Sequence, residues 1–220
     1  LNRPGGYSIA VYYSHNNRIY HNTFENSLLF VETRNRTRFT PSNSWDNGLE
    51  GNYWTSYRGV DVDRDAIGDK PYLIGENNID NFPLLGNYSD FKVTIGERTY
   101  SVSVISNSTI SQFQFNSEDE KVSFTATGFS KTTGFSRVTV PNELIQTLTY
   151  DNLTFSINGE QLVHQRRWAD NTNTYWYFSY VNTVPEPAIN SWYIVAAVSF
   201  IVVGIALVFA VLKKKQALKF

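Results

Sequence analysis

Four aspartates close together in the sequence, at positions 61, 63, 65 and 69, carry the clearest chemistry of the chain. Carboxylates at alternate positions of a tight loop can surround a hard cation such as Ca²⁺, which takes about six to eight oxygen ligands. The spacing matches positions 1, 3, 5 and 9 of a calcium-binding loop, and the backbone carbonyl at position 7 would add one more oxygen. The sequence therefore predicts a structural calcium site with the ligands Asp61, Asp63, Asp65, Ile67 and Asp69.

Two positions depart from that calcium-loop pattern. Ala66 stands at position 6, where such loops usually carry glycine for a sharp turn, and Tyr72 stands at position 12 in place of a bidentate glutamate. Glu76 or Asp80 could supply the missing oxygen. The alternative is an acidic, solvated turn whose side chains accept hydrogen bonds from nearby backbone amides.

The composition argues against several other kinds of chemistry. The chain has no cysteine and no methionine, so it offers no thiolate, no thioether and no cysteine nucleophile. Its three histidines, His15, His21 and His164, are scattered, and ordinary surface histidines are the expected explanation. The net charge of −1 does not suggest a broad basic surface for nucleic acid. We find no catalytic or cofactor-binding set, and whether the chain is an enzyme is left open.

Very short strands precede the acidic loop. Residues 8–31 contain four apolar groups of three to five residues, separated by asparagine-rich turns. Such groups are typical of a stacked parallel coil, in which inward asparagines can form ladders between rungs. Because each rung needs a neighbour to cover its edge, we expect further sequence upstream of Leu1. In the next segment, Trp45, Trp54 and Tyr57 are expected to form the core of a cap rather than to stack on sugar rings.

Residues 89–183 carry a clearer strand pattern. Apolar residues alternate around Gly96-Glu97 and before Asn158-Gly159, two dipeptides that favour two-residue hairpin turns. About seven strands at this spacing suit a β-sandwich. The segment Tyr175–Phe178 has aromatics on both faces, which indicates one core face and one face for a partner or a neighbouring domain.

The longest apolar run lies near the C-terminus. Trp192–Leu212 contains 21 residues without a charge, and Lys213–Lys215 follow directly. As a helix rising about 1.5 Å per residue, the run would be about 32 Å long, enough to cross a hydrocarbon core of about 30 Å. The lysines mark the C-terminal side as cytoplasmic. We expect a single-pass protein of the cell membrane, with its N-terminal part extracellular and its C-terminus cytoplasmic, held in the lipid bilayer through Trp192–Leu212.

An ordered series of motifs resembles the C-terminal end of NosD-like right-handed parallel β-helix proteins, a pattern common in archaeal surface proteins. The motifs are Asn16–Phe24, Trp45–Gly48, Gly51–Trp54, Asp61–Asp65 and Ile67–Tyr72. The resemblance covers about residues 7–85, and residues 90–182 look like the β-domain that often follows such coils before a C-terminal anchor. It implies the fold more directly than the function, because proteins with this coil include sugar-binding proteins, lyases, hydrolases and copper-maturation factors.

The expected fold is therefore all-β: the end of a right-handed parallel β-helix with its cap, then a β-sandwich and one C-terminal transmembrane helix. The expected parts are residues 1–88 for the final rungs and cap, 89–183 for the membrane-proximal sandwich, 184–191 for a linker, 192–212 for the transmembrane helix and 213–220 for a cytoplasmic tail. The linker, the apolar run and the lysines also resemble a sorting signal, which leaves open whether the anchor is processed. Glycosylation is permitted, without being indicated, at the sequons Asn35, Asn87, Asn107 and Asn152.

The functional hypothesis is a membrane-anchored cell-surface protein that presents a β-helix for polysaccharide or ligand binding and is non-catalytic in these residues. One alternative is an anchored polysaccharide lyase or hydrolase whose active groove lies on upstream rungs. Another is a structural component of the envelope. A copper-maturation factor is the least favoured, because Cu sites usually draw on cysteine, methionine or clustered histidine ligands.

Overall fold

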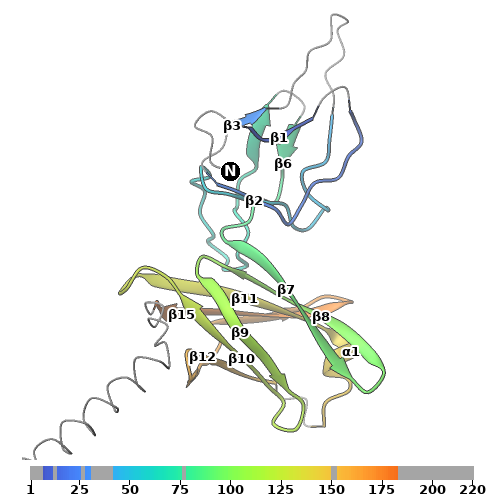
Figure 1. Ribbon diagram of the computed structural model, residues 1–220, viewed down its shortest axis with the longest axis vertical. Coiled ribbons are helices and arrows are strands. Elements are labelled where there is room, and N and C mark those ends of the chain that lie inside the picture. The colour runs from blue at the N-terminus through green and yellow to red at the C-terminus, as the bar shows by residue number, and fades with distance from the viewer. Residues whose placement is uncertain are drawn as a thin grey trace, which may run out of the picture. The chain divides into compact units, whose positions relative to one another are not determined.

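The computed structural model describes residues 7–11, 14–25, 28–30, 42–75, 78–149 and 153–182, and these residues form an all-β protein (Figure 1). The chain divides into two compact units, Leu1–Val184 and Pro185–Phe220. The expected linker, transmembrane segment and tail lie outside the described residues. Within the described part, no helix is long and apolar enough to cross a membrane.

Three pairs of short strands make up the N-terminal part of the first unit. Strands pair in parallel in the first two pairs and antiparallel in the third. They are β1 (Tyr7–Ala10) with β3 (Leu28–Phe30), β2 (Thr23–Phe24) with β4 (Tyr53–Trp54), and β5 (Tyr72–Gly75) with β6 (Asn78–Asp80). Further parallel bridges join Arg18 to Ser44 and Tyr53 to Leu84. The segments joined by β1–β3, β2–β4 and these two bridges therefore lie side by side in the same direction, whereas β5 and β6 run in opposite directions.

Asparagine side chains connect these segments in two ladders, as the sequence predicted. In the first ladder, the side-chain amide of Asn17 donates to Oδ1 of Asn43 at 2.8 Å, and the backbone N–H of Asn43 donates to Oδ1 of Asn78 at 3.3 Å. The indole of Trp45 also donates to Oδ1 of Asn78, at 2.9 Å. Each amide thus satisfies backbone or side-chain groups of the neighbouring segment, which a buried polar group requires.

The second ladder has the same form but ends in a carboxylate. The side-chain amide of Asn22 donates to Oδ1 of Asn52 at 3.0 Å, and the backbone N–H of Asn52 donates to Oδ2 of Asp80 at 2.8 Å. The indole of Trp54 donates to the same carboxylate oxygen at 2.8 Å. Burial raises the pKa of Asp80, although these donors and the backbone N–H of Phe82 oppose the rise. Asp80 is fully buried and so depends on these donors for its solvation.

The tryptophans that close the ladders also form the core of the N-terminal part. Trp45 is fully buried and Trp54 nearly so, which confirms the expected core position for both. Trp54 stacks on Phe24 with ring centroids 4.3 Å apart and on Tyr72 at 4.8 Å. Tyr57 is half-buried against the same cluster. Each indole therefore combines aromatic packing with a hydrogen bond to a ladder.

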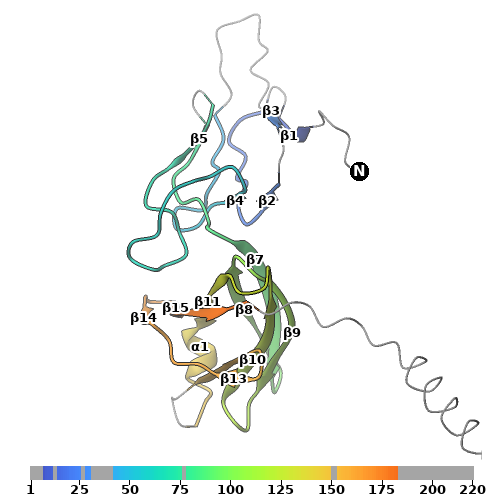
Figure 2. The same ribbon diagram turned by 90° about the vertical axis from the view of Figure 1, so that its left-hand side faces the viewer.

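Residues 87–181 form two sheets that enclose one hydrophobic core. The five-stranded sheet has the order β14-β15-β11-β8-β7, and the four-stranded sheet has the order β13-β12-β10-β9. Figure 2 shows β14, β15, β11 and β8 in one layer and β10 and β13 in the other. The strands are β7 (Asn87–Ile95), β8 (Arg98–Ser106), β9 (Thr109–Asn116), β10 (Lys121–Thr127), β11 (Thr133–Pro141), β12 (Thr154–Ile157), β13 (Glu160–Gln161), β14 (Arg166–Ala169) and β15 (Asn173–Val181). The core contains Val102, Val138, Phe124, Phe155 and Phe178.

Both predicted hairpins are present in this sandwich. Gly96 adopts a φ of +59° between β7 and β8, and Asn158 and Gly159 adopt +56° and +82° between β12 and β13. The sequence did not predict β13, β14 or the short helix α1 (Asn142–Ile145). Strand β7 begins at Asn87, so it includes the last two residues that the sequence assigned to the first part.

The two faces of β15 have different neighbours. Trp176 and Phe178 point into the sandwich core. Tyr177 packs instead with Ala66 and Leu84, which belong to the N-terminal part. The outer face predicted to meet a partner or a neighbouring domain is thus covered by residues of the same chain.

We expect Asn52→Ala to lower the free energy of unfolding by about 2–4 kcal/mol, because the carbonyls of Ile19 and Trp45 would each lose a buried donor. Urea titration of the purified chain followed by tryptophan fluorescence measures this. Asn22→Ala, in the same ladder but exposed, is the matched control and should cost less than about 1 kcal/mol. Equal losses in the two variants would contradict a central role for the buried rung.

Candidate functional site

The predicted calcium-binding loop is compact and closed by its own aspartates. Oδ1 and Oδ2 of Asp61 accept the backbone N–H groups of Asp65 and Ala66, each at 2.9 Å. Oδ1 of Asp65 accepts the N–H of Ile67 at 2.8 Å, and Oδ2 of Asp69 accepts the N–H of Val62 at 3.1 Å. These bonds are the backbone capping that the alternative interpretation predicted, and a carboxylate oxygen that accepts an N–H retains a lone pair for a cation.

Three of the five predicted ligands lie together. One carboxylate oxygen each from Asp61, Asp63 and Asp65 falls within a group whose members are at most 4.8 Å apart. Among the described residues this is the one cluster of acidic, histidine or cysteine side chains that could hold a metal ion, and no histidine belongs to it. Asp69 is not part of that group. The position of the carbonyl of Ile67 relative to the cluster stays a prediction.

The glycine position of the loop has a physical explanation. Ala66 adopts a φ of +66°, the left-handed conformation that calcium loops usually assign to glycine at this point. Its methyl group is fully buried with Leu84, Ile105 and Tyr177. The alanine therefore keeps the sharp turn at a small steric cost and attaches the loop to the outer face of the five-stranded sheet.

Burial and mutual repulsion act on the carboxylates of the loop. Loss of solvent raises the pKa of Asp61 and the pKa of Asp65, and the neighbouring charge of Asp63 adds to both rises. Arg166 of β14 lies beside the cluster, with its guanidinium 3.0 Å from Oδ2 of Asp63. This ion pair is partly exposed and contributes little stability, but it places one positive charge beside the carboxylate cluster.

A buried charged group links the N-terminal part to the sandwich. Arg137 of β11 is 2% exposed, pairs with Oε1 of Glu50 and donates to the backbone carbonyl of Asp65 at 3.0 Å. The other oxygen of Glu50 lies 2.7 Å from Nε2 of His21, whose ring stacks on Tyr88 with centroids 3.6 Å apart. Burial by itself would raise the pKa of Glu50, but the His21 hydrogen bond and the charge of Arg137 hold that pKa below its ordinary value.

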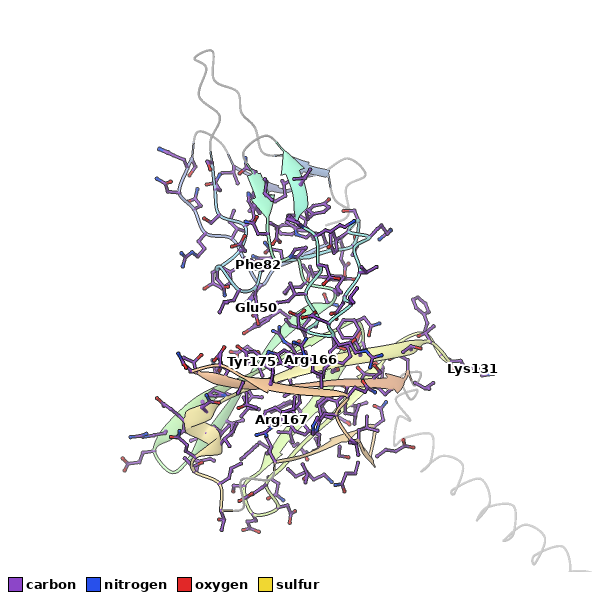
Figure 3. The ribbon with its side chains drawn as sticks, turned by 180° about the vertical axis from the view of Figure 1, so that it is seen from behind. Glu50, Phe82, Lys131, Arg166, Arg167 and Tyr175 are labelled. Atoms are coloured by element: carbon purple, nitrogen blue, oxygen red, sulfur yellow. The ribbon has the colours of Figure 1, made fainter. Side chains whose placement is uncertain are left out.

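Two cavities adjoin Glu50, and Leu49 and Tyr175 also line both. The first has a volume of about 260 Å³ and is also lined by Asp65, Arg137, Trp168 and Asp170. The second has a volume of about 300 Å³ and is also lined by His21, Asn47, Tyr88, Thr139 and Asn173. Figure 3 shows Glu50 facing the sheet that carries Tyr175 and Arg166.

The first cavity is acidic and aromatic. Trp168 and Tyr175 stack with centroids 5.0 Å apart, and the hydroxyl of Tyr175 donates to Asp170 at 2.6 Å. That hydrogen bond lowers the pKa of Asp170 to about 2, whereas burial and the same bond raise the pKa of Tyr175 to about 12. Asp170 is thus an anion and Tyr175 a neutral donor at neutral pH.

Sequence reasoning did not identify Glu50, Arg137 or the role of His21. The available signal was Arg137 itself, a charge between apolar residues in the predicted strand Arg137–Val140. Of the four sequons, Asn35 and Asn152 lie outside the described residues. Asn87 accepts a hydrogen bond from the hydroxyl of Thr23, and Asn107 accepts one from the backbone N–H of Phe135.

Comparisons with protein-family models, with curated proteins and with solved structures find no match to this chain.

We expect Glu50→Gln to lower the free energy of unfolding at pH 7 by roughly 3–5 kcal/mol, because it leaves the buried guanidinium of Arg137 without a counter-charge. Glu97→Gln, at the exposed tip of the β7–β8 hairpin, should change it by less than about 0.5 kcal/mol. Urea titration measures both.

The loss of stability caused by Glu50→Gln should become smaller as the pH falls. Since the pKa of Glu50 is lower in the folded chain than the ordinary value of 4.5, its contribution is complete above pH 4.5 and is lost as the pH falls through the folded pKa. The stability gap between the wild-type chain and Glu50→Gln should therefore narrow in acid. A gap that widened below pH 4 would contradict the assignment.

Proposed function

We propose that this chain belongs to a membrane-anchored cell-surface protein that presents the end of a right-handed parallel β-helix for binding polysaccharide. In this proposal residues 1–88 are rungs and cap, residues 89–183 are a membrane-proximal stalk, and Trp192–Leu212 is the transmembrane helix. The function proposed for these residues is to bind polysaccharide and to present the binding surface outside the cell.

The two asparagine ladders carry this proposal. Parallel pairing of β1 with β3 and of β2 with β4, together with amide-to-amide bonds between successive segments, is the bonding that stacked rungs use. The second ladder ends in Asp80, which accepts the indole N–H of Trp54. Large aromatic side chains that close such ladders would cover the last rung and protect its edge from other chains.

The proposed membrane anchor is supported by the position at which the chain leaves the sandwich. Asn182, the last described residue, donates its backbone N–H to the carbonyl of Thr132 at 2.9 Å. The same loop exposes 87% of Phe129, and Val181 is 67% exposed. Only residues 183–191 separate Asn182 from the apolar run, a reach of at most about 30 Å for an extended chain. A link this short suits a domain that lies next to its anchor in the chain.

Calcium is part of the proposal as a structural ion of the aspartate loop. The donors of Asp61, Asp63 and Asp65 are hard oxygens, which Ca²⁺ prefers, and Ala66 supplies the turn that the loop needs. The bound ion would relieve the repulsion between these carboxylates and strengthen the contact between the loop and the sheet.

We expect vesicles that carry the full chain to co-sediment with at least one insoluble polysaccharide from a panel of neutral and uronate polymers, and empty vesicles to stay in solution. The chain should also remain with the membrane pellet after alkaline carbonate extraction, and a variant that lacks residues 192–212 should not. Recovery of the intact chain in the carbonate supernatant would contradict the anchor. Vesicles that behave like empty ones on every polymer would contradict the binding function.

Millimolar Ca²⁺ should raise the Tm of the reconstituted chain, because a ligand that binds only the folded state stabilises it. The double variant Asp63→Ala/Asp65→Ala should show no rise, and Asp119→Ala, in the exposed β9–β10 turn, should keep it. Arg166→Gln should enlarge the rise at a given concentration, since it removes the positive charge beside Asp63. The Tm is read from near-ultraviolet circular dichroism. An equal rise in the double variant would place the calcium elsewhere.

A further inference from the structure

The larger of the two cavities is lined by a residue with a buried polar atom that the described residues do not satisfy. Thr139 of β11 lines this cavity, and 8% of its surface is exposed. Its Oγ1 is buried and has no hydrogen-bond partner among the described residues. Leaving a hydroxyl buried without a partner is unfavourable, so most such groups in folded proteins have a partner. Valine would fill the same strand position without that loss.

A second unsatisfied atom belongs to a residue that lines the other cavity. Nε of Arg137, whose other guanidinium nitrogens bind Glu50 and the carbonyl of Asp65, also lacks a partner among the described residues. Unsatisfied buried polar groups therefore concentrate on β11, at the two cavities that flank the Glu50–Arg137 pair. Such a concentration is typical of a place where a ligand or bound water completes the hydrogen bonding.

The lining of the larger cavity combines apolar surfaces with groups that can form hydrogen bonds to hydroxyls. Leu49, Tyr88 and Pro141 supply apolar and ring surfaces, and Asn47, Thr139 and Asn173 supply amide and hydroxyl groups. A pyranose ring has the matching chemistry, with an apolar face of C–H groups and an edge of hydroxyls. The volume of about 300 Å³ is at the small end of the range for small-molecule sites, which suits one sugar ring rather than several.

The charges around the cavity select against an acidic sugar. Glu50 lines it, and the lowered pKa of Glu50 keeps that carboxylate ionised at neutral pH. The guanidinium of Arg137 is already paired with Glu50 and lines the other cavity, where Asp65 and Asp170 add negative charge. The described residues that line the cavity include no arginine or lysine, so a uronate carboxylate would meet repulsion from Glu50 without such a cation to offset it.

We propose that the cavity between the loop Asn47–Glu50 and the outer face of the five-stranded sheet binds one neutral hexopyranose unit, whose hydroxyl pairs with Oγ1 of Thr139. The proposal rests on the function proposed above and gives its ligand a chemical class and a position. Binding here would place the sugar against the contact between the N-terminal part and the sandwich, rather than on the asparagine ladders.

Thr139→Val tests the proposal, because the exchange replaces the hydroxyl by a methyl group of the same shape. Two effects of opposite sign are expected. Without sugar, the Tm should rise by about 2–4 °C, because an unsatisfied polar group is removed. With sugar, binding of the methyl glycosides of glucose, galactose and mannose, measured by saturation-transfer NMR on the reconstituted chain, should weaken at least tenfold for whichever glycoside the wild-type chain binds. Thr94→Val, at an exposed position of β7 in the same sheet, should change neither quantity.

A second variant tests the apolar lining of the cavity, and a second ligand tests the preference for a neutral sugar. Leu49→Ala should weaken glycoside binding by removing an exposed side chain that lines both cavities, and methyl glucuronide should bind more weakly than the neutral glycosides. Glycoside binding that Thr139→Val leaves unchanged, or a lower Tm for that variant, would overturn the site. So would absence of glycoside binding by a chain that still co-sediments with polysaccharide. Absence of both would instead refute the function on which the site depends.

Discussion

The burial of one arginine side chain is the constraint on which the arrangement of this protein depends. Arg137 projects from the outer face of the five-stranded sheet, and a guanidinium remains charged wherever it is placed. It can be buried only if other residues supply acceptors, and here Glu50 and the carbonyl of Asp65 come from the N-terminal part. The same contact brings His21 to Glu50, holds the aspartate loop against the sheet and forms the wall between two cavities. A buried ion pair stabilises less than its Coulomb energy suggests, but the loss of either partner is severe, so the pair specifies one way of joining the two parts.

The asparagine ladders solve a related problem inside the N-terminal part. Strands of only two to four residues form few backbone bonds, so side chains must bind the remaining polar groups. An amide can do this on both sides because it donates and accepts at once. Asp80 can only accept, and the indole of Trp54 and the backbone N–H of Asn52 supply the donors that it needs. Ladder bonding and aromatic packing are thus parts of one interior.

The sequence predicted the features that depend on local backbone geometry, such as the hairpin turns. Gly96 and the Asn158-Gly159 pair marked hairpins because positive φ values restrict which residues can occupy those turns. The all-β class and the asparagine ladders followed from strand length and composition. By contrast, β14 has no alternating pattern of its own and exists because it pairs with β15 at the sheet edge.

The contact between the N-terminal part and the sandwich could not be predicted in the same way. Arg137 and Glu50 are 87 residues apart in the chain, and neither lies in a motif that indicates the other. The aspartates were found because their spacing is regular, but the capping of their oxygens by backbone amides depends on the folded loop. The transmembrane segment stays a prediction from the apolar run alone.

The central claim is that the buried pair holds the N-terminal part and the sandwich in one fixed arrangement. A chain without cysteine allows spin labels to be placed at Leu73→Cys and Lys131→Cys, two exposed positions in the two parts. Double electron–electron resonance should give one narrow distance distribution for the otherwise unchanged chain and a broad one when Arg137→Ala is added. A distribution that is already broad before that substitution, or one that Arg137→Ala leaves narrow, would contradict the account.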